Sequence, residues 1–135
     1  MEKMIERVGV LNMKSYKDLD IFQISKTLAI QVHSITLTLP KFEMYEEGSQ
    51  LRRSSKSIPT NIAEGFARRR YKADYIKYLI YAQAECDETL LHLELLRDTK
   101  SIVSPESVEP IMAEYDSLGR RINKFIQWTE DNWKP

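Results

Sequence analysis

The chain has 135 residues, with 20 acidic and 20 basic side chains, four glycines, five prolines and a single cysteine. This length suits one domain with one core, and so few glycines and prolines argue against a turn-rich all-β protein. One cysteine excludes an internal disulfide, no run approaches the roughly 20 apolar residues of a membrane span, and the first residues lack the apolar core of a signal peptide. We predict a cytoplasmic protein with no membrane partner.

The first predicted helix covers residues 18–39 and follows an N-terminal extension, residues 1–14, that has no clear periodicity. Its apolar side chains recur at intervals of three and four residues, which places them on one face of a helix. Pro40 ends the pattern, because the residue before a proline disfavours helical geometry. The stripe consists of Ile21, Ile24, Leu28, Val32, Ile35 and Leu39.

The second predicted helix begins near Glu43 or Tyr45 and kinks or restarts near Pro59, which lacks a backbone N–H. Asn61, followed three residues later by Glu64, has the spacing of a capping box for a restarted helix. Gly65 marks either the helix end or a close approach by another backbone. The alternative is an ordinary helix kink without a functional role. These residues form the structural signature of the chain, namely Pro59, Asn61, Glu64 and Gly65.

Two further helices complete the pattern. The third covers residues 72–99, and the fourth begins at Ser104-Pro105-Glu106, a typical start with a capping serine and a proline at the first helical position. Four amphipathic helices with short connections predict an all-α fold, an antiparallel up-down-up-down four-helix bundle over residues 15–130. Residues 131–135 are a C-terminal tail.

The sequence offers no catalytic constellation, no metal site and no cofactor motif. Inward carboxylates paired with Glu-x-x-His, as in metal-binding bundles, do not occur. His33 and His92 are interpreted as surface or hydrogen-bonded helix residues, and Cys86, on the apolar stripe of the third helix, as a small buried side chain. We predict that the protein is not an enzyme.

The most distinctive feature is the charge of residues 50–72. This basic segment has a net charge of +6, whereas the residues before it sum to −1 and those after it to −5. Such a cluster attracts phosphate or an acidic protein surface, although long basic side chains also cover apolar flanks with their charges in water. The candidate nucleic-acid-binding residues are Arg52, Arg53, Lys56, Arg68, Arg69, Arg70 and Lys72.

Self-association is a second expectation. Tyr45, Tyr75, Tyr78, Tyr81 and Trp128 are more large amphipathic side chains than one bundle core holds, so those left outside are interface candidates. The acidic residues of the third helix form either a solvated face or a surface that meets the basic segment of a neighbouring subunit. These residues are Glu85, Asp87, Glu88, Glu94 and Asp98.

The basic segment also carries a family resemblance. Residues 15–127 resemble the small four-helix-bundle family of 23S rRNA intervening-sequence proteins. The similarity includes the start of the first predicted helix (residues 16–22) and the start of the third predicted helix (residues 74–79). The specific part is Ser49-Gln50-Leu51-Arg52-Arg53 leading to Ser57-Ile58-Pro59-Thr60-Asn61-Ile62-Ala63-Glu64-Gly65.

The resemblance implies a bundle that assembles as a homopentamer. It also implies similarity to a retroelement accessory variability protein that binds a reverse transcriptase and nucleic acid. The retroelement relatives are strongly basic, whereas this chain is neutral with an acidic C-terminal half, and Ser54 and Ser55 stand where alanines are usual in the family. Two hypotheses follow: a non-catalytic oligomer that binds RNA or DNA, and a scaffold that docks an acidic protein partner or the next subunit.

Overall fold

Helices form the whole architecture of the described chain. The computed structural model describes residues 14–102 and 104–134, so the predicted extension 1–14 lies outside the described residues apart from Lys14. The elements are a short 3-10 helix, η1 (Tyr16–Asp18), and the α-helices α2 (Asp20–Thr36), α3 (Lys41–Tyr45), α4 (Glu47–Ala67), α5 (Lys72–Asp98) and α6 (Pro105–Asn132).

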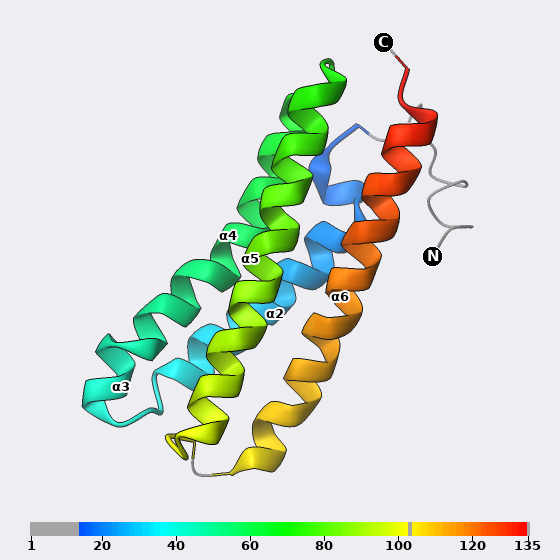
Figure 1. Cartoon of the computed structure of the whole chain (residues 1–135). Coiled ribbons are helices and arrows are strands. Elements are labelled where there is room, and N and C mark those ends of the chain that lie inside the picture. The colour runs from blue at the N-terminus through cyan, green and yellow to red at the C-terminus, as the bar shows by residue number, and fades with distance from the viewer. Residues whose placement is uncertain (1–13, 103, 135) are drawn as a thin grey trace.

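The long helices run antiparallel to their chain neighbours (Figure 1). α4 packs mainly between α2 and α5, and α6 packs on the other side of α5 and touches α2. The turn between α4 and α5 and the end of α6 lie at one end of the bundle, opposite α3 and the α5–α6 connection. The predicted all-α up-down-up-down bundle is therefore confirmed.

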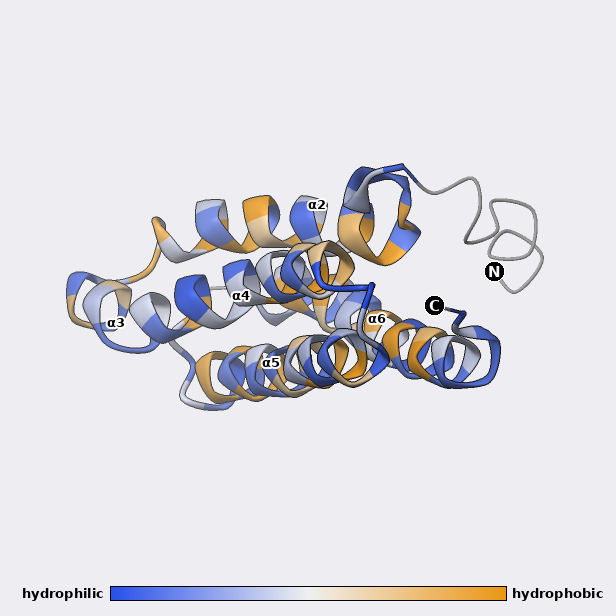
Figure 2. Ribbon diagram, turned by 90° about the horizontal axis from the view of Figure 1, so that it is seen from above, coloured by the Kyte–Doolittle hydropathy of each residue, from blue (hydrophilic) through white to orange (hydrophobic). Residues whose placement is uncertain are grey.

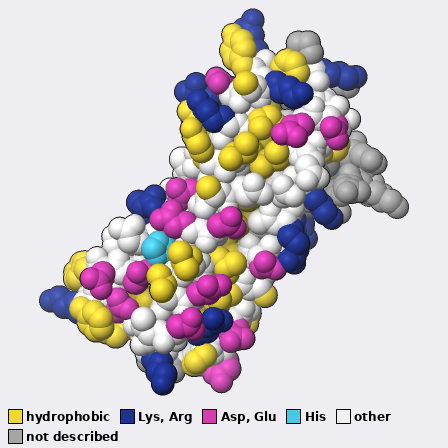
Figure 3. Space-filling view, viewed as in Figure 1, with side chains coloured by type: hydrophobic (Ala, Val, Ile, Leu, Met, Phe, Trp, Pro, Cys, Tyr) yellow, Lys and Arg dark blue, Asp and Glu magenta, His cyan; other side chains and the backbone are white. Residues whose placement is uncertain are grey.

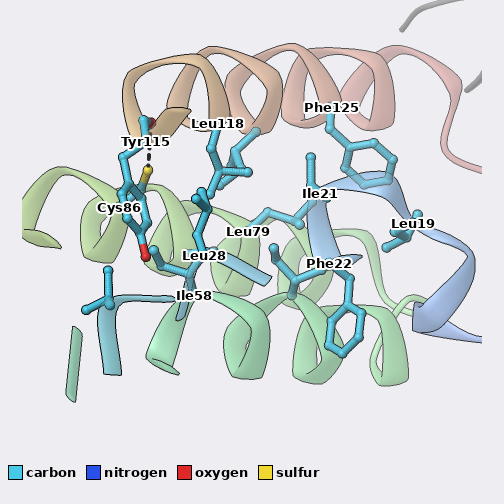
Figure 4. Packing of buried hydrophobic residues seen from close by; sticks show 14 of the residues in the cluster. Leu19, Ile21, Phe22, Leu28, Ile58, Leu79, Cys86, Tyr115, Leu118 and Phe125 are labelled. Atoms are coloured by element: carbon cyan, nitrogen blue, oxygen red, sulfur yellow. Dashed lines mark hydrogen bonds between the residues drawn. The ribbon is translucent and has the colours of Figure 1, made fainter. Parts of the chain in front are cut away.

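One continuous core joins the four long helices. Seen from above, hydrophobic and hydrophilic residues alternate along the ribbons of these helices (Figure 2). The predicted stripes supply the core, and Tyr115 and Phe125 are its largest fully buried members (Figure 4). Cys86 is buried as predicted, and its thiol donates to the carbonyl oxygen of Tyr115 over 3.3 Å. Burial, reinforced by the charges of Asp87 and Asp116, raises the pKa of this thiol to about 12.

The helix starts follow their sequence signals. Ser15 and Asp18 form a reciprocal capping box at η1, in which each side chain accepts from the backbone of the other end of the turn. α6 begins at Pro105 with Ser104 as its N-cap residue, as predicted. The first long helix ends at Thr36, three residues earlier than its apolar stripe, and Leu39 is buried from the turn that follows.

The second helical region is bent, and its interruption lies at Glu46. That residue has φ −100° and ψ −93°, which separates α3 from α4. α4 then continues through Pro59 without restarting, because the neighbouring Ile58 and Ile62 are fully buried and tertiary packing outweighs one lost helical hydrogen bond.

The predicted capping box at Asn61 and Glu64 is consequently wrong. Both residues lie inside α4. A capping box serves the unpaired backbone N–H groups of a helix's first turn, and in the middle of a helix those groups are already paired. The side-chain amide of Asn61 donates to the carbonyl of Ser57 over 2.9 Å, and the carboxylate of Glu64 accepts from Arg68. The two residues fill different roles on one uninterrupted helix.

Gly65 is a point of close approach between α4 and α5. A β-carbon added there would lie 3.1 Å from Cβ of Tyr78 and 3.3 Å from the carbonyl oxygen of Tyr75. The second alternative predicted for this glycine is thus the one observed: a helix passes too close for a side chain.

Candidate nucleic-acid interface

The seven candidate cations do not form one patch. Arg52, Arg53 and Lys56 lie in the first half of α4, whereas Arg68 to Arg70 and Lys72 surround the turn into α5. The 21 residues of α4 make a rod of roughly 30 Å, so the two groups lie at different levels of the bundle. In Figure 3, cations gather at the end with the α4–α5 turn, and carboxylates gather on the opposite half of the visible face.

Arg52 is a structural tie. Its guanidinium donates to the hydroxyl of Thr36 and to the carbonyl of Met44, both over 2.9 Å, and the side chain is partly buried. These bonds join the end of α2 and the short α3 to α4. Two of its five N–H donors are therefore engaged within the chain.

Arg53 is engaged by the acidic face of α5 within the same chain. Its guanidinium lies 2.6 Å from Glu88 and 3.7 Å from Glu85. Burial above all, and then a hydrogen bond with Glu88, raises the pKa of Glu85. Burial acts in the same direction on Glu88, but hydrogen bonds from Arg53 and its other neighbours outweigh it and lower the pKa of Glu88.

His92 extends this network. Its Nδ1 lies 2.6 Å from Glu47 on α4, and its Nε2 lies 3.4 Å from Glu88. The prediction of a hydrogen-bonded helix histidine is confirmed. Within residues 14–102 and 104–134, no group of three or more His, Cys, Asp and Glu side chains is arranged to hold a metal ion.

Lys56 and Arg68 are intermediate cases. Lys56 is exposed and borders a shallow groove between α2 and α4. Arg68 pairs with Glu64 at 2.8 Å and approaches Asp74 at 3.8 Å, and its guanidinium lies over the ring of Tyr78. Hydrogen bonding to Glu64 raises the pKa of Arg68. The carboxylate of Glu64 offsets part of the charge of this cation.

Arg69, Arg70 and Lys72 are exposed at the α4–α5 turn, and we call them the turn cluster. In the described part of the chain none of the three forms an ion pair with a carboxylate. The Arg69 guanidinium donates to the carbonyl of Phe66 over 3.0 Å and lies 4.0 Å from the centre of that ring. The turn cluster is thus a group of exposed cations with no carboxylate partner among the described residues.

A pocket opens beside the turn cluster, between the end of α4, the start of α5 and the end of α6. We call it the aromatic pocket; its cavity has a volume of about 350 Å³. Trp133 Nε1 donates to the carbonyl of Arg69 over 2.8 Å, which joins the end of α6 to the turn. The lining residues are Phe66, Ala67, Arg69, Arg70, Tyr75, Phe125, Trp128, Thr129, Trp133 and Lys134.

The sequence does not predict the aromatic pocket. Its patterns indicate Trp128 only as an interface residue, and they place Trp133 and Lys134 beyond the end of the predicted bundle. The relevant signal is topological: in an up-down-up-down bundle, the end of the fourth helix lies at the same level as the turn between the second and third. That relation brings Trp133 beside Arg69.

α5 carries a second apolar stripe on its outer surface. Ile80, Leu91 and Leu95 are 47%, 51% and 38% exposed, and Tyr81 beside them is 48% exposed. Ile80, Ala84, Leu91 and Leu95 recur at helical spacing, so α5 is apolar on opposite faces. Of the tyrosines proposed for an interface, Tyr75 is buried in the core, whereas Tyr45 and Tyr81 lie outside it.

Comparisons with known proteins agree with this fold. A family model described as 23S rRNA-intervening sequence protein matches residues 17–124. A solved structure of a protein of unknown function, from the S23 ribosomal protein family of Bacteroides thetaiotaomicron, is similar with a TM-score of 0.71 and 26% sequence identity. The similarity covers 79% of this chain and 95% of that one. A search of curated proteins finds no match.

No helix in the described ranges has the length and apolar character needed to span a bilayer.

Proposed function

The chain belongs to the 23S rRNA-intervening sequence protein family, and from this premise we propose that it is a non-catalytic, homo-oligomeric, cytoplasmic protein that binds RNA or DNA through phosphate groups. The proposal assigns the phosphate contacts to the turn cluster of Arg69, Arg70 and Lys72. Arg52 and Arg53 support the fold instead, because their guanidinium groups already have partners within the chain.

The single observation that carries the proposal is the exposure of the turn cluster without internal ion pairs. Unpaired guanidinium and ammonium groups bind phosphate oxygens and release condensed counterions, which is the main source of sequence-independent affinity for nucleic acid. Lys134 lies across the aromatic pocket from the turn and adds a fourth cation to the same end. The neutral net charge of the chain does not oppose this, because binding depends on local charge within about a Debye length.

Assembly is the second part of the proposal, with five subunits favoured by the family resemblance. The outer stripe of α5 supports it, because a helix that is apolar on opposite faces is typical of a position between two packed layers. The shallow groove between α2 and α4, bordered by Ile30 at 59% exposure, offers an apolar surface elsewhere on the same subunit. Pairing of different surfaces closes rings, and a ring multiplies weak phosphate contacts.

The test of phosphate binding is a charge reversal at two exposed positions of the turn cluster, Arg70→Glu combined with Lys72→Glu. Anisotropy titrations with structured RNA and duplex DNA should show affinity reduced by at least about tenfold at low salt. The slope of log K against log salt should become shallower by about 0.7–0.9 for each phosphate that the variant no longer neutralises. The matched control is Lys41→Glu with Lys100→Glu, which reverses two exposed charges at the opposite end of the bundle.

Three outcomes contradict the proposal. Wild-type protein that binds neither RNA nor DNA at low salt removes it and leaves the scaffold for an acidic protein as the alternative. Equal losses in the two double variants would mean that net charge, and not the turn cluster, governs binding. A monomer by light scattering at tens of micromolar would remove the oligomer.

A further inference from the structure

The aromatic pocket combines three features that a purely structural cavity does not need. The first is an aromatic lining in which each ring contacts the next. Phe66 and Tyr75 meet edge to face with centroids 6.5 Å apart, Tyr75 and Phe125 at 6.2 Å, and Phe125 stacks on Trp128 at 6.1 Å. Phe66, Tyr75 and Phe125 are buried, so the rings that can receive a stacked base are the half-buried Trp128 and Trp133.

The second feature is a buried hydroxyl without a partner. Thr129 lines the pocket, is only 3% exposed, and its Oγ1 has no hydrogen-bond partner among the described residues. A threonine inside a helix usually bonds the carbonyl four residues earlier, and a buried polar atom left unpaired is costly. A bound molecule whose polar edge reached this hydroxyl would supply the partner that it lacks.

The third feature is the charge around the opening. Arg69, Arg70 and Lys134 line the pocket, and no carboxylate is among the lining residues. The occupant that matches all three features has a flat heterocycle with hydrogen-bonding atoms on its edge and an anion attached nearby. A nucleotide has this chemistry, and a cavity of about 350 Å³ is in the range of small-molecule sites.

We propose that the aromatic pocket receives one unstacked nucleobase of a single-stranded nucleic acid, with its phosphate on Arg69, Arg70 and Lys134. This inference rests on the proposed function and narrows its substrate class from any polyanion to strands with an accessible base. The base stacks on Trp128 or Trp133 in the pocket, and its edge pairs with the hydroxyl of Thr129. A fully paired duplex offers the phosphates but no free base.

The two tryptophans of the chain, Trp128 and Trp133, both line the pocket, so intrinsic tryptophan fluorescence reports on this site alone. The probes are a short single-stranded RNA, an abasic strand of equal length and charge, a duplex, and a nucleoside monophosphate. We expect the RNA to quench the fluorescence and to bind about tenfold more tightly than the abasic strand, in line with one stacked base.

Thr129→Val tests the hydroxyl with almost no change in shape. It should weaken RNA binding roughly three- to tenfold, as loss of one hydrogen bond does, leave the affinity for the abasic strand unchanged, and not lower stability because an unpaired buried hydroxyl is removed. The control is Thr27→Val at an exposed site on α2, which should change none of these quantities.

The outcomes separate this inference from the proposed function. If no strand binds by anisotropy, both fail. If RNA, abasic strand and duplex bind equally and the tryptophans are not quenched, the pocket inference is overturned while phosphate binding stands. A nucleoside monophosphate that binds as tightly as the RNA would also overturn it, in favour of a site for free nucleotides, as would a Thr129→Val variant with unchanged RNA affinity.

Discussion

The first half of α4 and the turn that follows α4 carry similar positive charge along the sequence but use it differently. In the first half, Arg52 ties α2 and α3 to α4, and Arg53 pairs with the carboxylates of α5. At the other end, α4 is held against α5 by close packing at Gly65, and the cations of the turn cluster remain exposed. The cations that hold helices together are therefore paired, and the cations at the end where close packing holds α4 against α5 remain exposed.

The largest expected effect is on the first half. Arg52→Ala removes two hydrogen bonds from a partly buried guanidinium and leaves the hydroxyl of Thr36 without that donor. Hydrogen bonds to charged groups justify a loss of about 2–3 kcal/mol in the free energy of unfolding, measured by urea denaturation. RNA affinity should stay within about twofold of wild type. Lys56→Ala, at an exposed site, is the control. A stable variant with weak RNA binding would reverse the comparison between the two halves.

In the second half of α4, adding side-chain volume should lower the free energy of unfolding, whereas removing charge should not. Gly65→Ala places a methyl group 3.1 Å from Cβ of Tyr78 and 3.3 Å from a backbone oxygen of Tyr75, a crowding that a helix pair relieves only by moving apart. We expect a loss of about 1–2 kcal/mol.

Gly119→Ala is the matched control for this substitution. The nearest atom to its new methyl group is Sγ of Cys86 at 3.8 Å, an ordinary van der Waals distance. This variant should gain about 0.5–1 kcal/mol from helix propensity. Equal effects at the two glycines in thermal unfolding would show that the α4–α5 packing is not especially tight.

The carboxylates that face Arg53 predict a smaller, pH-dependent effect. Burial raises the folded-state pKa of Glu85 above its ordinary value of 4.5. The stability that this group contributes is therefore fully present below pH 4.5 and is lost as the pH rises through the folded-state pKa. The amide in Glu85→Gln does not titrate, so the variant should gain stability relative to wild type between pH 4 and pH 7, by less than about 1 kcal/mol after solvent screening.

Glu88→Gln provides the opposite sign. The folded-state pKa of Glu88 is lowered, so its contribution is present above the unfolded-state pKa and is lost as pH falls through the folded-state value. This variant should lose stability at pH 7 and approach wild type in acid. Urea unfolding of both variants at the two pH values checks the pair, and gains of the same sign would contradict the assignment.

The smallest effect is expected at Asn61. Its side chain bonds the carbonyl of Ser57 inside a continuous helix, so Asn61→Ala exchanges one hydrogen bond for better helix propensity, with a net change within about 0.5 kcal/mol. A loss of 1 kcal/mol or more, as for a helix cap, would mean that α4 does restart after Pro59. Thermal unfolding measures the difference.

Most of the fold could be predicted from the sequence, because apolar spacing and the start signal at Ser104 and Pro105 depend on residues close along the chain. The behaviour at Pro59 could not, since the gain from burying Ile58 and Ile62 depends on the partner helices. For the same reason the pairing of Arg53 with Glu88 depends on the register between α4 and α5. The aromatic pocket could not be predicted either, because it joins residues more than 60 positions apart, such as Arg69 and Trp133, which share a hydrogen bond.

The single thiol in the core can be used to measure how often the bundle opens. Cys86 is 2% exposed and its pKa is raised to about 12, so an alkylating reagent meets a reactive thiolate only after α5 and α6 have separated around it. The rate of labelling under native conditions therefore measures how often the bundle opens. If subunits assemble through the outer stripe of α5, that rate should fall as protein concentration rises, because association stabilises the closed form.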